Sequence, residues 1–292
     1  MGRRGREWQE SVGAALGVAV TAARPLAGGD INQAFALTLA DGRTVFAKTN
    51  ADAPRSMFAT EASGLAWLQQ AKALRVPQVL AVAPVEHDGP GFLVLEHIEE
   101  APRRRDFDEV LGRGLAALHR FGAPSFGLDR DNFVGRLPQE NAPLPTWAAF
   151  YRARRLEPQL RRAVDRGLIP GDVRAAFDRL FTLCEALCGP PEPPARLHGD
   201  LWGGNHIVDE TGSPCLIDPA VYGGHREIDL AMMRLFGGYD ARVFAAYAEV
   251  FPLAPGHEER ISLHQLYPLL VHVNLFGGGY VPSVAAALDR LV

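Results

Sequence analysis

The chain has 292 residues, 47% of them hydrophobic, and a formal net charge of −4. This hydrophobic fraction excludes a disordered chain, and the length suits one large domain or two moderate ones. The small negative charge, without a long basic block, argues against a protein that binds nucleic acid or a membrane surface.

The N-terminal residues allow two interpretations. Arg3-Arg4, followed by an apolar run over residues 12–19, faintly resembles a twin-arginine export signal. Trp8 and Val12, however, keep the spacing of one helix face, which favours an amphipathic first helix. No other segment is long enough to cross a bilayer. We therefore expect a cytoplasmic protein whose three cysteines are reduced core thiols, since they lack the two pairs of a structural zinc site.

Five strands and one helix are predicted before residue 98. Apolar alternation and turn residues place the strands from 18 towards 26, then at 35–39, 44–48, 76–80 and 91–96, with the helix over 56–73. Gly28-Gly29, followed by Asn32, lies between the first two strands. This glycine turn is placed like a loop that covers nucleotide phosphates, although such a pair alone is more often only a tight turn.

Lys48 ends the third predicted strand, beneath the glycine turn, where an ammonium group can reach phosphate oxygens. Glu61, in the following helix, is its expected counter-ion, and a solvated surface glutamate is the alternative. The chain then leaves the sheet through Glu96-His97-Ile98, whose backbone groups we expect to bind adenine. A change of composition over residues 99–105 indicates an interlobe connection, so that we predict two domains, 1–98 and 99–292.

The rest of the chain is predicted to be mainly helical. Helices are expected from Asp106 towards His119 and over 147–166, with a bend at Pro158, and then over 172–187, 227–236, 241–250, 258–274 and 283–291. Residues 126–141 are predicted to form a loop. A five-stranded antiparallel sheet with a helix, followed by a helical lobe, indicates an α+β bilobal fold.

The segment RLHGDLWGGNHIVDETGSPCLIDP, residues 196–219, carries the predicted chemistry. Asp200 and Asn205 have the D-x-x-x-x-N spacing of a phosphoryl-transfer loop, in which the Asp accepts the substrate proton and the Asn binds magnesium. Asp218 follows an apolar strand after a predicted hairpin and would supply a further magnesium ligand. The alternative is an ordinary turn and strand end, which explains each residue singly but not all three together. We therefore predict a kinase-like site that uses ATP and Mg2+.

Together these residues resemble the fructosamine kinase family, also called ketosamine 3-kinases, within the group that contains aminoglycoside phosphotransferases and choline kinases. The resemblance covers nearly the whole chain, in LHGDLWGGN, LIDPAVYGGHREIDLAMMRLFGG, QLYPLLVHVNLFGGGY, DNFVGRLPQEN and MFATEASGL. Asp30 departs from it, because several eukaryotic members carry cysteine there. The resemblance implies a protein-kinase-like fold and transfer of the ATP γ-phosphoryl group to the 3-hydroxyl of a ketosamine, a sugar that glycation has attached to an amine. The product then releases the amine, a deglycation repair.

The resemblance also implies roles for single residues. Asp200 would be the general base, Asn205 and Asp218 the magnesium ligands, and Lys48 the phosphate-binding lysine. Candidates for substrate binding are Trp202, His272, Asn274 and Asn141. For His272, a hydrogen-bonded core histidine is the alternative. Asp229 resembles the buried Asp that braces the catalytic loop backbone in kinase-like folds.

Two other functions remain open at this stage. A kinase of another small hydroxylated substrate, such as an aminoglycoside or choline, would use the same loop, but an acidic pocket would be expected for a polycationic drug. DNFVGRLPQEN and VHVNLFGGGY are nearly balanced in charge, which suits a neutral sugar. A nucleotide-binding pseudokinase scaffold is disfavoured because the residues that phosphoryl transfer needs are intact, namely Lys48, Asp200, Asn205 and Asp218. We expect a small-molecule or protein-bound ketosamine as partner, and neither nucleic acid nor membrane.

Overall fold

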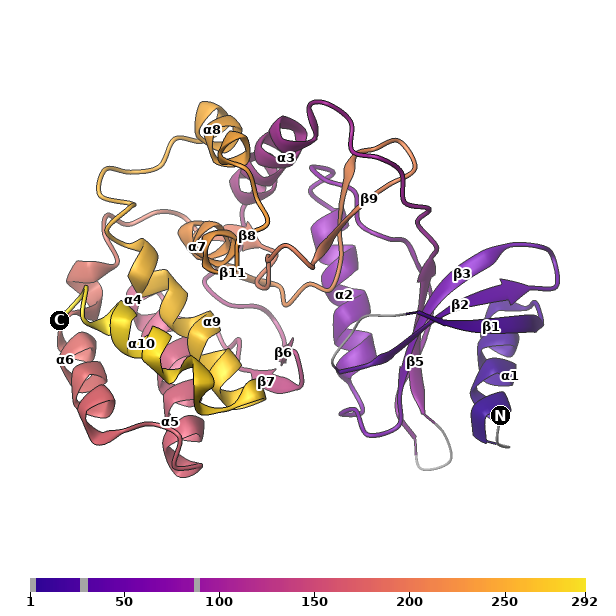
Figure 1. The fold of residues 1–292 in the computed structure, drawn as a ribbon, viewed down its shortest axis with the longest axis horizontal. Helices are drawn as coiled ribbons and strands as arrows, with labels where there is room; N and C mark the ends of the chain where they lie inside the picture. Colours follow the sequence, from indigo (N-terminus) through magenta and orange to yellow (C-terminus); the bar gives the residue numbers. More distant parts are fainter. Residues whose placement is uncertain (1–3, 27–30, 87–89) are drawn as a thin grey trace. The chain divides into compact units, whose positions relative to one another are not determined.

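The computed structural model describes residues 4–26, 31–86 and 90–292 (Figure 1). The chain forms two compact units, the first made of residues 1–104 and 207–218 and the second of residues 105–206 and 219–292. The predicted domain boundary at 98 and 99 stays a prediction. The compact units add a feature that this prediction lacks, because residues 207–218 return to the first unit.

The first unit contains a five-stranded antiparallel sheet, as predicted. Its strands are β1 (Val20–Leu26), β2 (Gln33–Leu39), β3 (Thr44–Asn50), β5 (Gly91–Glu96) and β4 (Val79–Ala83), in that spatial order. Strand β3 continues past Lys48, because Thr49 and Asn50 pair with β5. Strand β4 begins later than predicted. Pro77 has no backbone N–H to donate, so it cannot pair fully, although the neighbouring Gln78 oxygen accepts from the Glu96 N–H of β5 at 2.9 Å.

Two helices accompany this sheet, α1 (Arg4–Leu16) and α2 (Met57–Gln69). Trp8 and Val12 of α1 are buried in one cluster with strand residues, which confirms the amphipathic first helix. Helix α2 is shorter than predicted. After it the chain turns, and Lys72 adopts a positive φ of 50°, which is incompatible with a continuing helix.

Strands β9 (His206–Val208) and β10 (Pro214–Leu216) form the predicted hairpin. Arg75 ties this hairpin to the first unit. Its guanidinium donates to Asp209 at 3.1 Å and to Glu210 at 2.7 Å, and its backbone oxygen accepts from the Leu216 N–H at 2.9 Å. Residues 207–218 therefore pack with residues much earlier in the chain, and the sequence alone does not reveal this placement.

The second unit is mainly helical, as predicted. Its helices are α3 (Phe107–Phe121), α4 (Trp147–Phe150), the π-helix η1 (Tyr151–Leu156), α5 (Glu157–Asp165), α6 (Gly171–Leu187), α7 (Glu227–Leu235), α8 (Ala241–Val250), α9 (Ile261–Phe276), the 3-10 helix η2 (Gly278–Tyr280) and α10 (Val281–Leu288). Two small antiparallel sheets join β6 (Asn132–Val134) to β7 (Leu137–Gln139) and β8 (Ala195–Leu197) to β11 (Tyr222–Gly224).

Two predictions for this unit need correction. The expected loop over residues 126–141 contains the β6–β7 hairpin, whose strands of three residues are too short to show alternation in the sequence. The expected single helix over 147–166 is interrupted by η1, ahead of Pro158. Pro158 lies in the first turn of α5, which continues directly from η1. Its missing N–H cannot donate to the Arg154 oxygen, which instead accepts from Arg155 Nη1 at 3.0 Å.

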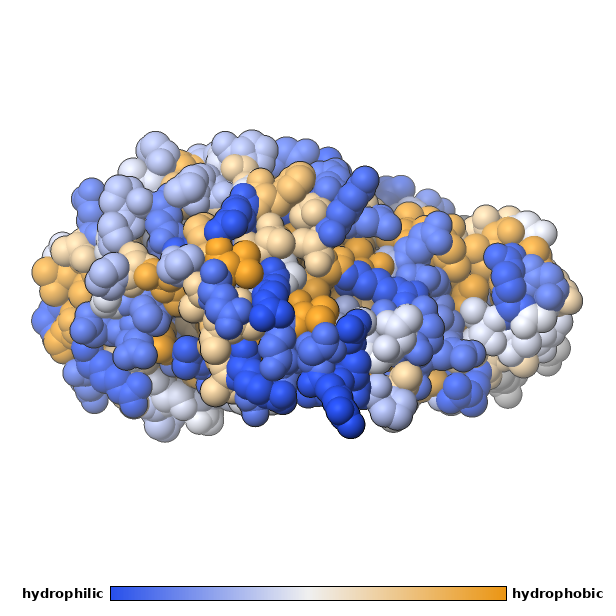
Figure 2. All heavy atoms as spheres, turned by 90° about the horizontal axis from the view of Figure 1, so that it is seen from above, coloured by the Kyte–Doolittle hydropathy of each residue, from blue (hydrophilic) through white to orange (hydrophobic). Residues whose placement is uncertain are grey.

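The surface is mostly hydrophilic on the face drawn in Figure 2, with smaller hydrophobic areas between. Exposed large hydrophobic side chains of the second unit include Trp202, Phe236 and Phe276, at 42%, 40% and 50% exposure. Among the described residues, no helix combines the length and the apolar character that a bilayer crossing requires.

Candidate active site

In the first unit, Lys48 is held between two carboxylates. It lies on β3 and is 7% exposed. Its Nζ donates to Glu61 Oε1 of α2 at 2.8 Å and to Asp218 Oδ1. The predicted pairing of Lys48 with Glu61 is thus confirmed, and Asp218 is a second partner. Burial alone would lower the pKa of Lys48, but the charges of Asp218 and Glu61 outweigh it and raise the pKa, so that the ammonium stays charged.

Asp218 lies two residues beyond β10 in a left-handed backbone conformation, with φ of 55°. Such a conformation costs a residue other than glycine about 1–3 kcal/mol, although Asp tolerates it better than most. The strain is consistent with a functional position. The side chain is 42% exposed, so that its carboxylate is accessible to a cation from solvent.

The structure describes only some of the first-unit residues that we predict to bind nucleotide. Gly28 and Gly29, like Asp30, lie outside the described residues. Asn32 follows them, and its Oδ1 accepts from Asn50 Nδ2 at 3.1 Å, which ties the chain after the glycine turn to the end of β3.

The Glu96 side chain is engaged within the first unit. Its Oε1 accepts from the Gln78 N–H at 3.0 Å, and Oε2 lies 3.4 Å from Arg75. Only the backbone of Glu96, with that of the half-buried His97 and Ile98, could therefore meet a nucleotide. Their role in adenine binding stays a prediction.

In the second unit, a buried carboxylate holds the backbone of the predicted catalytic loop, residues 198–205. Asp229 of α7 is 1% exposed and accepts hydrogen bonds from the N–H groups of His198 at 2.8 Å and Gly199 at 2.9 Å. Burial raises the pKa of Asp229, but the hydrogen bond with His119 and the other donors outweigh it and lower the pKa. Asp229 is therefore an ionised brace for this loop, as predicted.

His119 was not assigned a role by the sequence. Its Nε2 lies 3.2 Å from Asp229 Oδ2 and its Nδ1 lies 2.9 Å from the Tyr247 hydroxyl. The ring is 2% exposed, and these two contacts hold it against the brace. In the sequence, His119 is only a polar residue near a helix end, and its partners come from helices far along the chain.

Asp200 and Asn205 meet as their spacing predicts. Asn205 Nδ2 donates to the backbone oxygen of Asp200 at 2.7 Å and to its Oδ2 at 3.0 Å. The amide nitrogen of Asn205 is therefore engaged in hydrogen bonds within the loop. The amide oxygen of Asn205 is the atom that could bind a metal. Gly199 precedes Asp200 with φ of 83°, and a Cβ there would lie 2.0 Å from the Ala220 oxygen. Only glycine fits this position.

His272 lies in a partly exposed aromatic cluster near the end of α9. Its ring centroid is 4.5 Å from that of Phe236, 5.4 Å from Phe276 and 5.1 Å from Tyr280. Nδ1 lies 2.8 Å from the Pro268 carbonyl oxygen, so this nitrogen carries the proton and Nε2 has the free lone pair. Burial lowers the pKa of His272, and the bond to Pro268 opposes this only in part. A neutral imidazole with an acceptor nitrogen results.

The other three predicted substrate residues differ sharply in exposure. Trp202 is 42% exposed, and its backbone oxygen accepts from the Tyr239 hydroxyl at 2.9 Å. Asn141 is 0% exposed, and Asn274 is 2% exposed with its Nδ2 bonded to the backbone oxygen and Oε1 of Gln159, both at 2.9 Å. This burial argues against the predicted contacts of Asn141 and Asn274 with substrate. The sequence could not reveal it, because the partners are distant in the chain.

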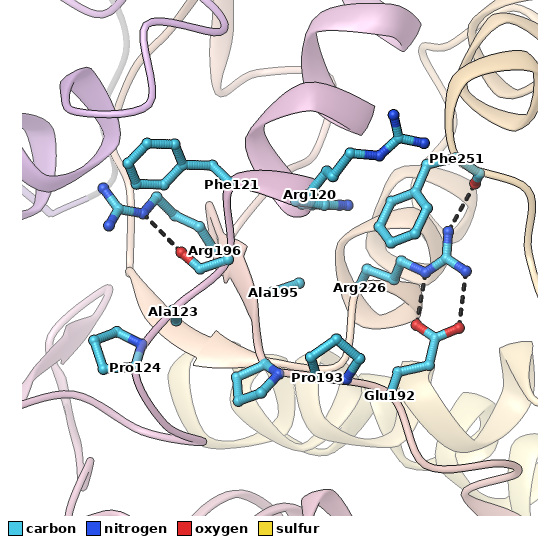
Figure 3. Close-up of a pocket in the computed structure, with 13 residues that line it drawn as sticks. Arg120, Phe121, Ala123, Pro124, Glu192, Pro193, Ala195, Arg196, Arg226 and Phe251 are labelled. Carbon is cyan, nitrogen blue, oxygen red and sulfur yellow. Dashed lines mark hydrogen bonds and ion pairs between the residues drawn. The ribbon is translucent and has the colours of Figure 1, made fainter.

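A pocket of about 490 Å³ lies elsewhere in the second unit, between the end of α3 and β8 (Figure 3). Arg226 crosses one side of it and is paired with Glu192 at 2.7 and 2.8 Å, while Arg196 Nε donates to the Gly122 oxygen at 3.3 Å. Of the predicted site residues that the structure describes, none lines this pocket. Its lining includes His119, which also lies 3.2 Å from Asp229.

A buried group of His225, Glu227 and His264 places potential metal-ligand atoms within 4.8 Å of one another. Arg260 already donates to both oxygens of Glu227, at 2.8 and 2.6 Å. Since this ion pair neutralises the carboxylate, we interpret the group as structural.

Comparison with known proteins identifies the family. The model of the family described as "Fructosamine kinase" matches residues 5–292. The chain belongs to the fructosamine kinase family. This is a family of phosphotransferase enzymes, and the predicted resemblance is confirmed.

Relatives in the family extend over almost the whole chain. A probable ketoamine kinase of Synechocystis sp. is 39% identical over 273 residues, covering 91% of this chain and 89% of its own. A protein-ribulosamine 3-kinase of Oryza sativa subsp. japonica is 36% identical, covering 97% and 82%. A solved structure from Thermobifida fusca, named as a "putative fructosamine-3-kinase", is 40% identical with a TM-score of 0.88, covering 97% of each chain.

More distant structures show the fold alone. An aminoglycoside phosphotransferase superposes with a TM-score of 0.64 at 16% identity, over 97% of this chain and 98% of its own. The predicted kinase-like α+β fold is thereby confirmed.

Proposed function

We propose that the protein is an ATP- and magnesium-dependent kinase that phosphorylates the 3-hydroxyl of ketosamines and thereby initiates deglycation. The observation that carries the proposal is the catalytic loop, in which Asp200 is tied to Asn205 and its backbone is held by Asp229. Relatives named as ketoamine and ribulosamine kinases support the substrate class. The substrate would be a ketosamine carried by a small molecule or by a protein, and the location cytoplasmic.

Each proposed residue contributes one part of phosphoryl transfer. Asp200 accepts the proton of the sugar hydroxyl as it attacks, and Lys48 contacts phosphate oxygens. Asn205 and Asp218 would hold Mg2+, because oxygen atoms are the ligands that this ion prefers. The bound ion supplies neutralisation of the charge on the phosphoryl group. The chain itself therefore contributes mainly positioning and a base.

A coupled ADP-release assay tests the substrate class. The panel contains fructosamine, ribulosamine and erythrulosamine derivatives, an aminoglycoside and choline, each with ATP and magnesium. We expect turnover with the ketosamines at least about tenfold above that with the others, because a site that pairs a substrate hydroxyl discriminates strongly. Preferential turnover of the aminoglycoside or choline would show a different kinase, and ADP release with no acceptor dependence would refute acceptor phosphorylation.

Removal of the proposed metal ligand should abolish stabilisation by nucleotide. Wild-type protein at a Mg-ATP concentration of 100 Kd gains about 2.7 kcal/mol by mass action. Asp218→Ala should lose most of this gain, and Lys48→Met should lose part of it. Thermal shift with and without magnesium measures both. Asp41→Ala, which removes an exposed carboxylate paired with Arg43, is the control. A full magnesium-dependent shift in Asp218→Ala would contradict the assignment.

Loss of the His272 imidazole should weaken sugar recognition specifically. His272→Ala should reduce kcat/KM for a ketosamine by about 5- to 150-fold, the equivalent of about 1–3 kcal/mol for an unpaired polar group, and reduce the basal ATPase rate less. His272→Phe preserves packing against Phe236 and Phe276 but offers no acceptor, so its kcat/KM should match that of His272→Ala. Restored kcat/KM in His272→Phe would assign the residue to packing.

A further inference from the structure

The motif DNFVGRLPQEN, residues 131–141, turns three amide side chains into the protein interior. Asn132, Gln139 and Asn141 are 6%, 2% and 0% exposed. Gln139 Nε2 and Asn141 Nδ2 both donate to Asn132 Oδ1 at 2.8 Å. Buried amides cost free energy unless their groups are paired, so a set of three that bond one another indicates a specific arrangement. We call these three residues the amide network.

The amide network ends on the backbone of residues 220–222. Asn132 Nδ2 donates to the Val221 oxygen at 2.8 Å, and Gln139 Nε2 donates to the Ala220 oxygen at 3.1 Å. Because these carbonyl groups belong to buried residues, they need donors from elsewhere in the chain. The amide network supplies these donors and fixes where the segment runs.

Residues 220–222 in turn support the start of the catalytic loop, because they contact residues 197–199. The Ala220 N–H donates to the His198 oxygen at 2.9 Å, and Tyr222 pairs with Leu197 where β11 meets β8. The Ala220 oxygen also packs so closely on Gly199 that a Cβ there would lie only 2.0 Å from it. A displacement of Ala220 would therefore move the residue that precedes Asp200.

Two further side chains hold the amide network in one orientation. The Tyr267 hydroxyl donates to Gln139 Oε1 at 2.6 Å, and Arg155 donates to Asn141 Oδ1 at 2.6 Å. Burial raises the pKa of Tyr267, and the charge of Asp200 adds to this effect, so that the hydroxyl keeps the proton that it donates. Each amide oxygen of the network therefore has a donor.

We propose that the amide network and Tyr267 position the catalytic loop for phosphoryl transfer, an inference that rests on the proposed function. These are positioning residues, because they act through the backbone of residues 220–222. Misplacement of reacting groups by about 1 Å can cost ~10²-fold in rate. Disruption of the amide network should therefore lower kcat. The KM for Mg-ATP should change less than kcat, because Lys48 and Asp218 lie in the first unit and only Asn205, of the proposed Mg-ATP contacts in the described residues, belongs to the loop.

Two matched substitutions separate positioning from stability. Gln139→Met removes a buried amide of the network, and Gln159→Met removes one of equal size on α5 that is 3% exposed and bonds Asn274 instead. Both variants should have a lower Tm. Only Gln139→Met should lose kcat, by at least about tenfold, with a smaller change in the KM for Mg-ATP. Tyr267→Phe should act in the same direction, and its effect should not add fully to that of Gln139→Met.

The proposal is overturned if Gln139→Met keeps wild-type kcat, or if Gln159→Met loses as much kcat as Gln139→Met. Should Gln139→Met fail to fold, Tyr267→Phe decides, because it removes a single hydroxyl: wild-type kcat in that variant refutes the proposal. The rates are measured with the acceptor that the wild-type enzyme phosphorylates best. If the ketosamine assignment is wrong, the wild-type enzyme will prefer a different acceptor. The kcat values of the variants can still be compared with that acceptor.

Discussion

Replacement of Asp200 by asparagine should reduce turnover by ~10²- to 10⁴-fold, which is the usual contribution of a general base. Asparagine preserves the shape of the side chain and an oxygen that can still accept from Asn205, which donates to Asp200 Oδ2 at 3.0 Å. It cannot accept the proton of an attacking hydroxyl. The loss should therefore lie in kcat, and both the melting temperature and the stabilisation by Mg-ATP should remain near the wild-type values.

Measurement of kcat in the ADP-release assay, together with a thermal shift with Mg-ATP, checks this expectation. Asp178→Asn on the exposed surface of α6 is the control for the same substitution away from the loop. More than about a tenth of wild-type turnover in Asp200→Asn would remove Asp200 from the role of base. A loss confined to KM would instead indicate a residue that binds substrate without taking part in proton transfer.

Replacement of Asp229 by alanine should damage both stability and turnover. The substitution leaves the N–H groups of His198 and Gly199 without their acceptor, at about 1–3 kcal/mol each. The expected loss is thus about 2–6 kcal/mol, a large part of the 5–15 kcal/mol that stabilises a typical domain. Asp229→Asn retains one acceptor oxygen and should fall between the wild type and Asp229→Ala. Chemical denaturation and kcat, measured on the same samples, give both effects.

The effect of Asp229 should depend on pH in one direction. Because its folded pKa lies below the ordinary value of 3.8, its stabilising contribution is present above that value and is lost as the pH falls through the folded pKa. The difference in unfolding free energy between wild type and Asp229→Ala should therefore be constant near neutrality and shrink in acid. Asp108→Ala, which removes a carboxylate paired with Arg242, should leave kcat unchanged. Equal stability and kcat in Asp229→Ala and wild type would refute the brace.

Much of the fold was predictable because its signals are local. Alternating apolar residues and turn residues located four of the five strands within a few positions, and the helical periodicity located α7 and α8 closely. The spacing of Asp200 and Asn205 predicted a contact that a short loop can make without help from the rest of the chain. At β4 the error arose beside Pro77, which cannot donate to a ladder, whereas the β6–β7 hairpin was missed because its strands of three residues are too short to show alternation.

The sequence by itself determined the family, the catalytic loop and the pairing of Lys48 with Glu61, because each depends on a motif or on neighbouring elements. Only the tertiary structure decided which polar residues face inwards. Asn141 lies in a segment whose composition predicted a loop, yet its side chain is fully buried and bonded to Arg155. His119 meets Asp229, 110 residues further along the chain. A polar side chain carries no local signal of its partner, because that partner is set by how distant segments pack. His119 and the amide network therefore became visible only in three dimensions, whereas the resemblance had already indicated Asp229.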